Sequence, residues 1–359
     1  MGDADQMIME IGIKFPIRAQ FGHQEHEIYS CIKQQIVTKF PIGNSLIVNM
    51  TWFGPQFDNG EWQKLQCLIA ESKKFDRLFW LCIVDPVTLL PDQIAKVEQQ
   101  LQITDTYYVG PAFAGHYGFN THAIVCLEEF PNYSESDLLL NSVEFVYLNY
   151  NRKPKPHRIQ LVEMLYQHQL EKYGTITLGK NDATYNVSQG LHTPLHLTSE
   201  DSTDYTRNGK FPIDRQFGGV PYDLCSLGNL DRWQSHFLNV VGETEFYPWD
   251  TVFVTEKTWK PIIGLRPFVI NGQTTVYHWL RDNGFQTFND YWPHIKVEDV
   301  EEFAVHDSII TVIKFLTEKT NEDLLAMYTD MLPRLRHNRK RFFEFAQEQK
   351  IKISQLLTQ

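Results

Sequence analysis

The chain has 359 residues, which is long for one domain and sufficient for two. Hydrophobic residues make up 42% of the sequence and aromatic residues 13%, a composition that excludes a chain disordered throughout its length. The net charge of -11 argues against a protein whose whole surface binds nucleic acid or an anionic membrane.

The cysteines and the start of the sequence indicate the cellular compartment in which the protein is expected. The cysteines lack CxxC spacing, so we expect reduced core residues rather than disulfides or a zinc site. The first ten residues are acidic and lack the apolar segment of a signal peptide. No apolar run approaches about 18 residues, so no membrane span is predicted. These features predict a cytoplasmic protein.

The first part of the chain reads as alternating strands and helices. Residues 1–25 are expected to be a frayed start or an edge strand, and residues 27–40 have helical spacing of apolar side chains. Apolar runs that predict buried strands are 45–50, 77–84, 106–111 and 123–127, and the helical segments between them are 62–72 and 91–101. This alternation predicts an α/β domain with a parallel sheet.

A polar, acidic stretch over 131–141 is the expected domain linker, and a strand follows over 144–150. The next residues are basic and lead into a helix that ends before Tyr173-Gly174. An arginine at a strand-to-helix junction can bind a pyrophosphate with both arms of its guanidinium, which makes Arg158 and Arg152 candidates. The alternative is that the basic run 152–158 is a solvated loop.

Residues 180–230 are polar and show little periodicity, so we expect a lid or binding loop there. His192 and His196 are four residues apart, but Pro194 lies between them. They are therefore not expected to share a helical face, and no metal site is predicted.

The segment 250–292 predicts a strand, a helix, a second strand and a second helix. Thr251–Val254 is the first expected strand, and Thr255 can cap the helix that follows. A helix N-terminus at the carboxyl end of a strand is where α/β folds bind phosphates, and Lys257 adds a full positive charge. Glu256 can accept hydrogen bonds from sugar hydroxyls. The alternative is that Glu256 and Lys257 are surface charges on a first helical turn.

The C-terminal part predicts helices over 307–317 and 321–345, with Pro333 expected to kink or split the second. A basic cluster follows Pro333 and consists of Arg334, Arg336, Arg339, Lys340 and Arg341. It is more typical of a solvated helix end than of a nucleic-acid site.

Several of these residues together resemble a known family. The residues Val254, Thr255, Glu256, Lys257, Trp259, Gly264, Pro267 and Gly272 resemble the donor-binding signature of GDP-fucose-dependent α1,3-fucosyltransferases and of related bacterial and viral enzymes. A second match lies at 145–174, where Arg158 is the closest equivalent of the donor-phosphate arginine and Arg152 the second choice. Gly242-Glu243-Thr244 stands where the family has Glu-Asn-Ser. The resemblance covers roughly residues 145–300. If the protein is viral, the resemblance implies that it is located in the cytoplasm of the host cell.

The resemblance implies a GT-B fold of two Rossmann-like, doubly wound domains that face a central cleft. We expect an acceptor domain over 1–140, a donor domain over 141–335, and a C-terminal helix over 336–359 that crosses back to the first domain. The expected donor contacts are Arg152, Arg158, Glu243, Thr255, Glu256 and Lys257. No Asp-x-Asp ends a predicted strand, so neither a metal nor a cofactor is expected; the nucleotide-sugar is a co-substrate.

By resemblance, the reaction is glycosyl transfer with inversion from a GDP-sugar, which needs a base from the first domain. Candidates at predicted strand ends are Asp85, His116, Glu128 and Glu129, and the sequence does not choose among them. The expected acceptor is a glycan or surface polysaccharide. Alternatives are hydroxymethylated bases of viral DNA and a non-catalytic sugar-binding or structural protein of the same fold. No G-x-G-x-x-G follows a predicted strand, which argues against a dehydrogenase. The sugar and the oligomeric state stay open.

Overall fold

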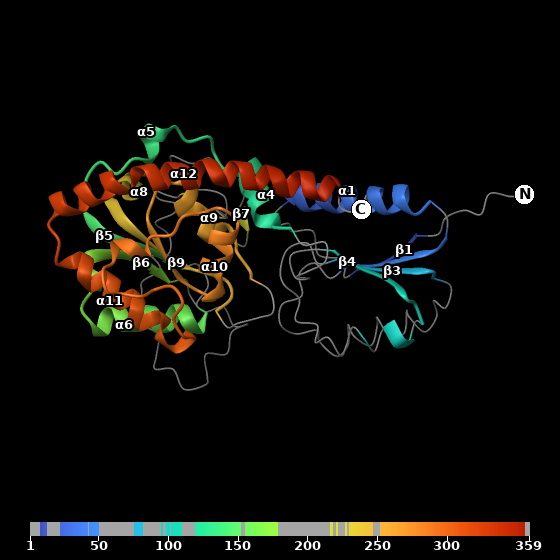
Figure 1. Cartoon of the computed structure of the whole chain (residues 1–359), viewed down its shortest axis with the longest axis horizontal. Helices are drawn as coiled ribbons and strands as arrows, with labels where there is room; N and C mark the ends of the chain where they lie inside the picture. Colours follow the sequence, from blue (N-terminus) through green and yellow to red (C-terminus); the bar gives the residue numbers. More distant parts are fainter. Residues whose placement is uncertain are drawn as a thin grey trace, which may run out of the picture. The chain divides into compact units, whose positions relative to one another are not determined.

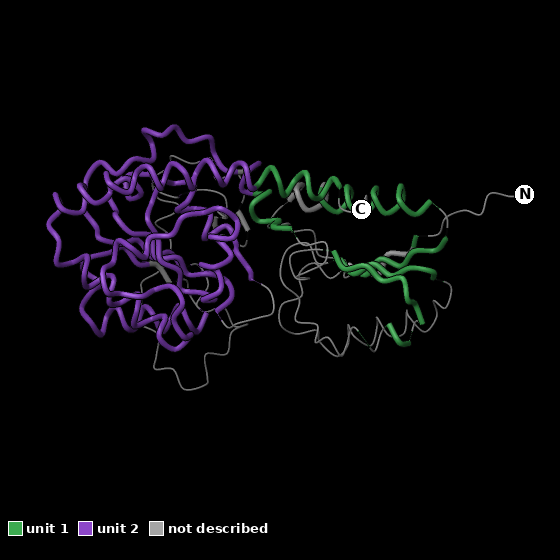
Figure 2. The backbone as a smooth tube through the Cα atoms, viewed as in Figure 1, with its two compact units in different colours: residues 1–125, 346–359 green, residues 126–345 purple. Residues whose placement is uncertain are grey.

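The computed structural model describes residues 8–12, 22–41, 43–49, 75–81, 95, 98–100, 102–109, 119–151, 155–178, 216–217, 220–221, 227, 230–246 and 252–355. The protein is an α/β structure whose two four-stranded sheets are parallel. The chain divides into two compact units, which are Met1–Val125 with Ala346–Gln359, and Cys126–Phe345 (Figure 2).

The sheet of the first unit has the strand order β1-β2-β3-β4, with bounds Ile8–Gly12, Ser45–Asn49, Arg77–Leu81 and Asp105–Val109. Its edge strand β1 confirms the edge strand expected within 1–25. Helix α1 (Gly22–Lys39) follows β1 and buries Ile28, Ile32 and Ile36, which recur every four residues on one helical face.

One predicted strand is wrong. Residues 123–127 lie in helix α4 (Thr121–Glu129). Asn120 accepts a hydrogen bond from the backbone N–H of Ala123 at 2.8 Å, as an N-cap does. The side chains from Thr121 to Cys126 are all buried, so the run shows no polar face that would distinguish a helix from a strand. Glu128 and Glu129, expected at a strand end, therefore lie in the last turn of a helix.

The sheet of the second unit has the strand order β10-β9-β5-β6, with bounds Phe268–Asn271, His236–Gly242, Phe145–Asn151 and Gly174–Leu178. Helix α6 (Pro156–Gln167) joins β5 to β6, and the chain then returns to the opposite side of β5 to form β9. The winding direction thus reverses between β5 and β9, which is the topological switch point of a doubly wound sheet.

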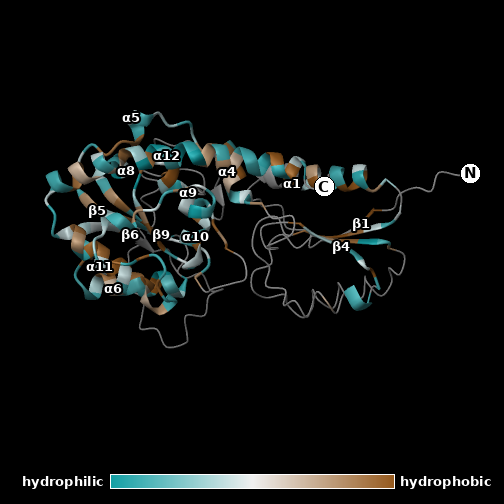
Figure 3. Ribbon diagram, viewed as in Figure 1, coloured by the Kyte–Doolittle hydropathy of each residue, from teal (hydrophilic) through white to brown (hydrophobic). Residues whose placement is uncertain are grey.

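Helices cover both faces of this second sheet. Figure 1 shows α6 and α11 (Val305–Thr317) on one side of the strands and α8 (Leu230–Ser235) and α12 (Asn321–Ser354) on the other. Hydrophobic residues concentrate on the strands between these helices, while the helices carry much of the hydrophilic surface (Figure 3).

The remaining elements are α5 (Glu135–Leu138), η1 (Glu171–Tyr173), β7 (Gln216–Phe217), β8 (Val220–Pro221), α9 (Glu256–Ile263), α10 (Thr275–Asp282), η2 (Asn289–Tyr291) and η3 (Glu302–Ala304).

The strand expected over Thr251–Val254 is also absent, since residues 252–255 have no regular structure. Side chains bind two of the backbone donors that a sheet would otherwise engage. Phe253 donates its N–H to Gln273 Oε1 at 2.9 Å, and Thr255 donates its N–H to Glu243 Oε1 at 3.0 Å. The strand that precedes α9 in the sheet is instead β9.

Helix α12 continues through Pro333, so the prediction that this proline could split the helix is wrong. Tyr328, Met331, Leu335 and Phe342 form a buried stripe on both sides of the proline. Their burial stabilises one continuous helix despite the missing hydrogen bond. Among the helices that the structure describes, none has the length and apolar character that a membrane crossing requires.

Candidate functional site

Three loops leave the carboxyl ends of neighbouring strands in the second unit. One leads from β5 to α6, one follows β9 over 243–246, and one follows β10 over 272–274. Because the strands are parallel, these loops share one edge of the sheet. Ligands of doubly wound folds bind at this edge, beside the switch point, here between β5 and β9.

Glu243, the first residue after β9, is fully buried and organises this edge. Its Oε1 accepts hydrogen bonds from the Thr255 N–H at 3.0 Å and the Thr258 hydroxyl at 2.7 Å. Its Oε2 accepts from the Thr244 N–H at 2.8 Å and the Thr255 hydroxyl at 2.7 Å. Four donors thus satisfy the carboxylate, which fixes the N-terminus of α9 against the end of β9.

The backbone carbonyl of Glu243 holds Arg158. The guanidinium donates to this oxygen from Nη2 at 2.7 Å and from Nε at 3.3 Å, and the Arg158 side chain is buried. The neighbouring Asn151 requires a glycine at 242, since a Cβ there would lie 2.2 Å from Asn151 Oδ1, while Arg158 Nε would stay at a contact distance of 3.4 Å. Gly242 therefore leaves room for Asn151, the last residue of β5, beside the end of β9.

Two lysines meet on Thr244, the next residue of the same loop. Lys155 donates from Nζ to the Thr244 carbonyl at 2.6 Å, and its Nζ lies 3.3 Å from Glu245 Oε1. Lys257 donates from Nζ to the Thr244 hydroxyl at 3.1 Å and pairs with Glu256 Oε1 at 2.6 Å. Lys155, Arg158 and Lys257 thus converge from two segments on residues 243–245.

The charges of these three cations interact. Burial lowers the pKa of Lys155, the Glu245 carboxylate opposes this shift, and the charges of Arg158 and Lys257 lower the pKa further. Both lysines already have a carboxylate partner. Their side chains keep some exposure, which is 20% for Lys155 and 28% for Lys257. An incoming anion can therefore share these donors and relieve the mutual repulsion.

A stack of three rings supports the same loop. The Phe246 ring lies between the rings of His157 and His306, with centroid distances of 5.2 and 5.1 Å. Burial, followed by the charge of Arg158, lowers the pKa of His157 to about 3, so this imidazole is neutral. Its Nε2 lies 2.9 Å from the Glu243 carbonyl, which can only accept, so Nε2 carries the proton.

The structure thus brings five of the predicted donor residues to one place: Arg158, Glu243, Thr255, Glu256 and Lys257. Arg152, Asp85 and His116 lie outside the described residues, as does most of 180–230. Glu128 is exposed in the last turn of α4 and does not follow a strand directly.

Sequence reasoning did not single out Lys155, His157, Phe246, Gln273 or His306. Lys155 lies in the basic run already noted beside Arg158. Lys155 directly precedes Pro156, the first residue of α6. Because proline is common at the first position of a helix, the sequence could have placed this lysine at the junction between β5 and the helix. The stacked rings had no such signal, because they come from three separate segments.

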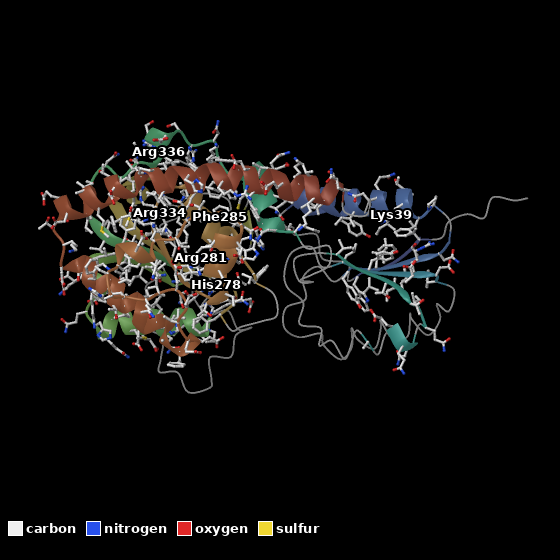
Figure 4. The ribbon with its side chains drawn as sticks, in the orientation of Figure 1. Lys39, His278, Arg281, Phe285, Arg334 and Arg336 are labelled. Atoms are coloured by element: carbon white, nitrogen blue, oxygen red, sulfur yellow. The ribbon has the colours of Figure 1, made fainter. Side chains whose placement is uncertain are left out.

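The basic cluster of α12 has partners within the fold. Arg334 pairs with both carboxylate oxygens of Asp290 at 2.5 and 2.8 Å. Arg336 pairs with Glu135 of α5, and Figure 4 shows Arg336 next to this helix. Arg339 donates to the Tyr133 carbonyl at 3.0 Å, and Arg341 to the Asn283 carbonyl at 2.7 Å. These arginines brace α12 against neighbouring segments, which argues against a nucleic-acid surface there.

The sequence matches no protein-family model, and no curated protein is significantly similar to it. A functional assignment therefore depends on the geometry of the sheet edge and on the residues that resemble the fucosyltransferase signature.

Proposed function

We propose that the protein is a glycosyltransferase of the GT-B type that transfers a sugar, with inversion, from a GDP-sugar to an acceptor hydroxyl. The observation that carries this proposal is the convergence of Lys155, Arg158 and Lys257 on residues 243–245 at the switch point of the second sheet. That position, at the start of α9, is the one at which doubly wound folds bind phosphates.

The site offers a diphosphate several kinds of donor. Lys155 and Lys257 supply partly exposed ammonium groups, and the buried guanidinium of Arg158 adds its positive charge from behind the Glu243 carbonyl. These groups would stabilise the negative charge that develops on the departing nucleoside diphosphate as the sugar passes through an oxocarbenium-like state. Glu256 is buried and pairs with Lys257, and we propose that it holds this lysine in position for the diphosphate.

For the acceptor base, Asp85 and His116 stay predictions from the sequence. We propose a glycan or surface polysaccharide as the acceptor. Hydroxymethylated DNA is the weaker alternative, because the arginines of α12 already have partners in the fold. A non-catalytic sugar-binding protein of the same fold is the other alternative, and turnover distinguishes it from an enzyme.

The test is release of nucleoside diphosphate from a panel of GDP-, UDP-, ADP- and CMP-activated sugars in the presence of glycan acceptors. We expect turnover with a GDP-sugar and a loss of about a hundredfold or more in Lys257→Ala, as on removal of one transition-state donor. Lys260→Ala is the matched control, because Lys260 lies one turn further along α9 and is also half-buried. No turnover with any donor would contradict the proposal.

A further inference from the structure

A small hollow lies where α12 meets the short helix α5, two elements that run next to each other in Figure 1. Its volume is about 150 Å³, and it is lined by Glu135, Leu265, Arg336, Arg339, Lys340 and Phe343. All of these residues belong to the second unit. A nucleotide-sized ligand needs about 300 Å³ or more, so the hollow fits one small group rather than a nucleotide.

Positive charge exceeds negative charge in the lining of this hollow. Three cations, Arg336, Arg339 and Lys340, stand against one carboxylate, that of Glu135. Arg336 engages this carboxylate, with Nε at 2.9 Å and Nη2 at 2.6 Å from Glu135 Oε1. The partner of Lys340 is more distant, since Glu344 Oε1 lies 3.6 Å from its Nζ. The Lys340 and Arg336 side chains are 80% and 52% exposed, so a ligand in the hollow can reach both.

Arg339 is the cation with the least compensation of its charge. It donates from Nη2 to the Tyr133 carbonyl at 3.0 Å, and no carboxylate of the described residues lies within ion-pairing distance of it. Burial lowers the pKa of Arg339, and the negative charge of Glu135 opposes this shift. A half-buried guanidinium bonded to a neutral carbonyl keeps its full charge. An anion in the hollow would therefore offset its desolvation.

Phe343 adds an apolar wall to the hollow. Its side chain is one of the few large hydrophobic side chains of the described residues that stay exposed. Arg339 Cζ lies 5.7 Å from the centre of the Phe343 ring, so the charge and the ring are adjacent. Phe343 follows Arg339 by four residues and Arg336 by seven, a spacing that puts all three on one face of the helix. An anion held by the cations thus has an apolar surface beside it.

We infer that this hollow binds the phosphate group of a small phosphate monoester, with the organic part of the ligand against Phe343. A monoester carries about 1.5 to 2 negative charges at pH 7, which matches three cations against one carboxylate. The N–H groups of a guanidinium bind phosphate oxygens with favourable geometry. The hollow shares no residue with the diphosphate site at the sheet edge, and the inference does not depend on the proposed function.

Calorimetric titration of the full chain with phenyl phosphate, phenyl sulfate and inorganic phosphate tests this inference. The titrations use Lys257→Ala, because that substitution weakens the proposed diphosphate site, which would also bind these anions. Phenyl sulfate has nearly the shape of phenyl phosphate but a single negative charge, so we expect a Kd about tenfold higher. Inorganic phosphate lacks the ring that would contact Phe343, so it should also bind more weakly than phenyl phosphate.

Substitutions in the hollow identify the binding groups. Arg339→Gln should raise the Kd for phenyl phosphate about tenfold, and Lys340→Ala, at a more exposed side chain, about threefold. Phe343→Ala should raise the Kd for phenyl phosphate and leave that for inorganic phosphate unchanged. Lys319→Ala is the matched control, because it removes another exposed lysine whose Nζ lies over a phenylalanine ring, and it should change no Kd.

The contrary results are distinct from those expected. Absence of phenyl phosphate binding, or an unchanged Kd in both Arg339→Gln and Lys340→Ala, would overturn the site. Equal binding of phenyl phosphate and inorganic phosphate would overturn the assignment to an ester. Because Lys340 and Phe343 are exposed, their truncation should leave the protein folded. In a chain that keeps Lys257, these two substitutions should also leave GDP binding unchanged, and a parallel loss of GDP binding would contradict a separate site.

Discussion

The Glu243 carboxylate accepts two hydrogen bonds from Thr255, one from its backbone N–H at 3.0 Å and one from its hydroxyl at 2.7 Å. Thr255 is the N-cap of α9, so this pair joins the end of β9 to the start of that helix. Lys257 follows in the first turn, and its position over Thr244 depends on this junction. Glu243 is accordingly a positioning residue.

Glu243→Gln should destabilise the protein without removing volume from the core. The amide retains one acceptor oxygen but turns its NH₂ group towards two donors that the carboxylate now satisfies. Loss of two charge-assisted hydrogen bonds predicts a decrease of about 3 kcal/mol in the free energy of unfolding, measured by urea denaturation. Glu245→Gln, at a half-exposed side chain, should cost less than about 1 kcal/mol. Equal effects of the two substitutions would contradict the organising role of Glu243.

Gly242→Ala should weaken anion binding as well as stability. The added Cβ would lie 2.2 Å from Asn151 Oδ1 and would displace this side chain, which lies beside Arg158 at the end of β9. We expect a loss of about 1–3 kcal/mol in stability and a higher Kd for pyrophosphate. The control is Gly284→Ala, which strains a residue at φ +84° beyond α10. That variant should lose stability by a similar amount while retaining the wild-type Kd.

Stability should decline as the pH falls below about 6.5, because buried histidines stay neutral in the folded protein. An unfolded histidine takes up a proton near pH 6.5, whereas the pKa of His157 in the folded protein is about 3, lowered mainly by burial. Burial also lowers the pKa values of His306 and His236. The unfolded chain therefore binds more protons, and the stability present above pH 6.5 is lost towards pH 3.

His157→Gln tests the share of this one residue. Its free energy of unfolding, followed by urea denaturation between pH 6.5 and 4, should fall less steeply than that of the wild type, by up to about 1.4 kcal/mol per pH unit. A glutamine amide can still donate to the Glu243 carbonyl, which limits the loss of packing. An unchanged slope would show that His157 takes up its proton equally in both states.

Arg266 should be the most costly buried charge to remove. Its guanidinium is fully buried and donates to the carbonyls of Leu138, Trp233, His236 and Leu265 and to the Tyr328 hydroxyl. Arg266→Met removes all of these donations, while the Leu265 carbonyl keeps another donor, the Tyr328 hydroxyl at 3.1 Å, so we expect a loss of about 4 kcal/mol in unfolding free energy. Tyr328→Phe removes one hydroxyl and should cost about 1 kcal/mol. A loss for Arg266→Met no larger than that of Tyr328→Phe would contradict this account.

The sequence predicts a strand reliably where apolar runs are short and bounded by turns, as for β3, β5 and β10. It fails where tertiary partners decide the conformation. Thr251–Val254 has strand composition, but the Gln273 side chain binds the N–H of Phe253 and the Glu243 side chain binds the N–H of Thr255, the next residue after the segment. At 123–127, a run buried on all sides gives no period from which a helix can be recognised.

The candidate site likewise has one part that the local sequence predicts and another part that depends on the tertiary structure. The position of Lys257 after a helix cap is visible in the sequence, because capping is local chemistry. The dependence of Arg158 on the Glu243 carbonyl is not visible, because 85 residues separate the two. The order of β5 and β9 in the sheet brings them together, and composition does not encode that order.

The most direct test of the central claim is the binding of GDP, UDP, ADP and CMP to the wild type, Lys257→Ala and Lys260→Ala, followed by thermal shift and calorimetry. A ligand at a hundred times its Kd that binds only the folded state adds about 2.7 kcal/mol to stability. We predict stabilisation by GDP that is lost in Lys257→Ala and retained in Lys260→Ala. Stabilisation by none of the four nucleotides, or equal stabilisation of both variants, would contradict a nucleotide-sugar site at this edge of the sheet.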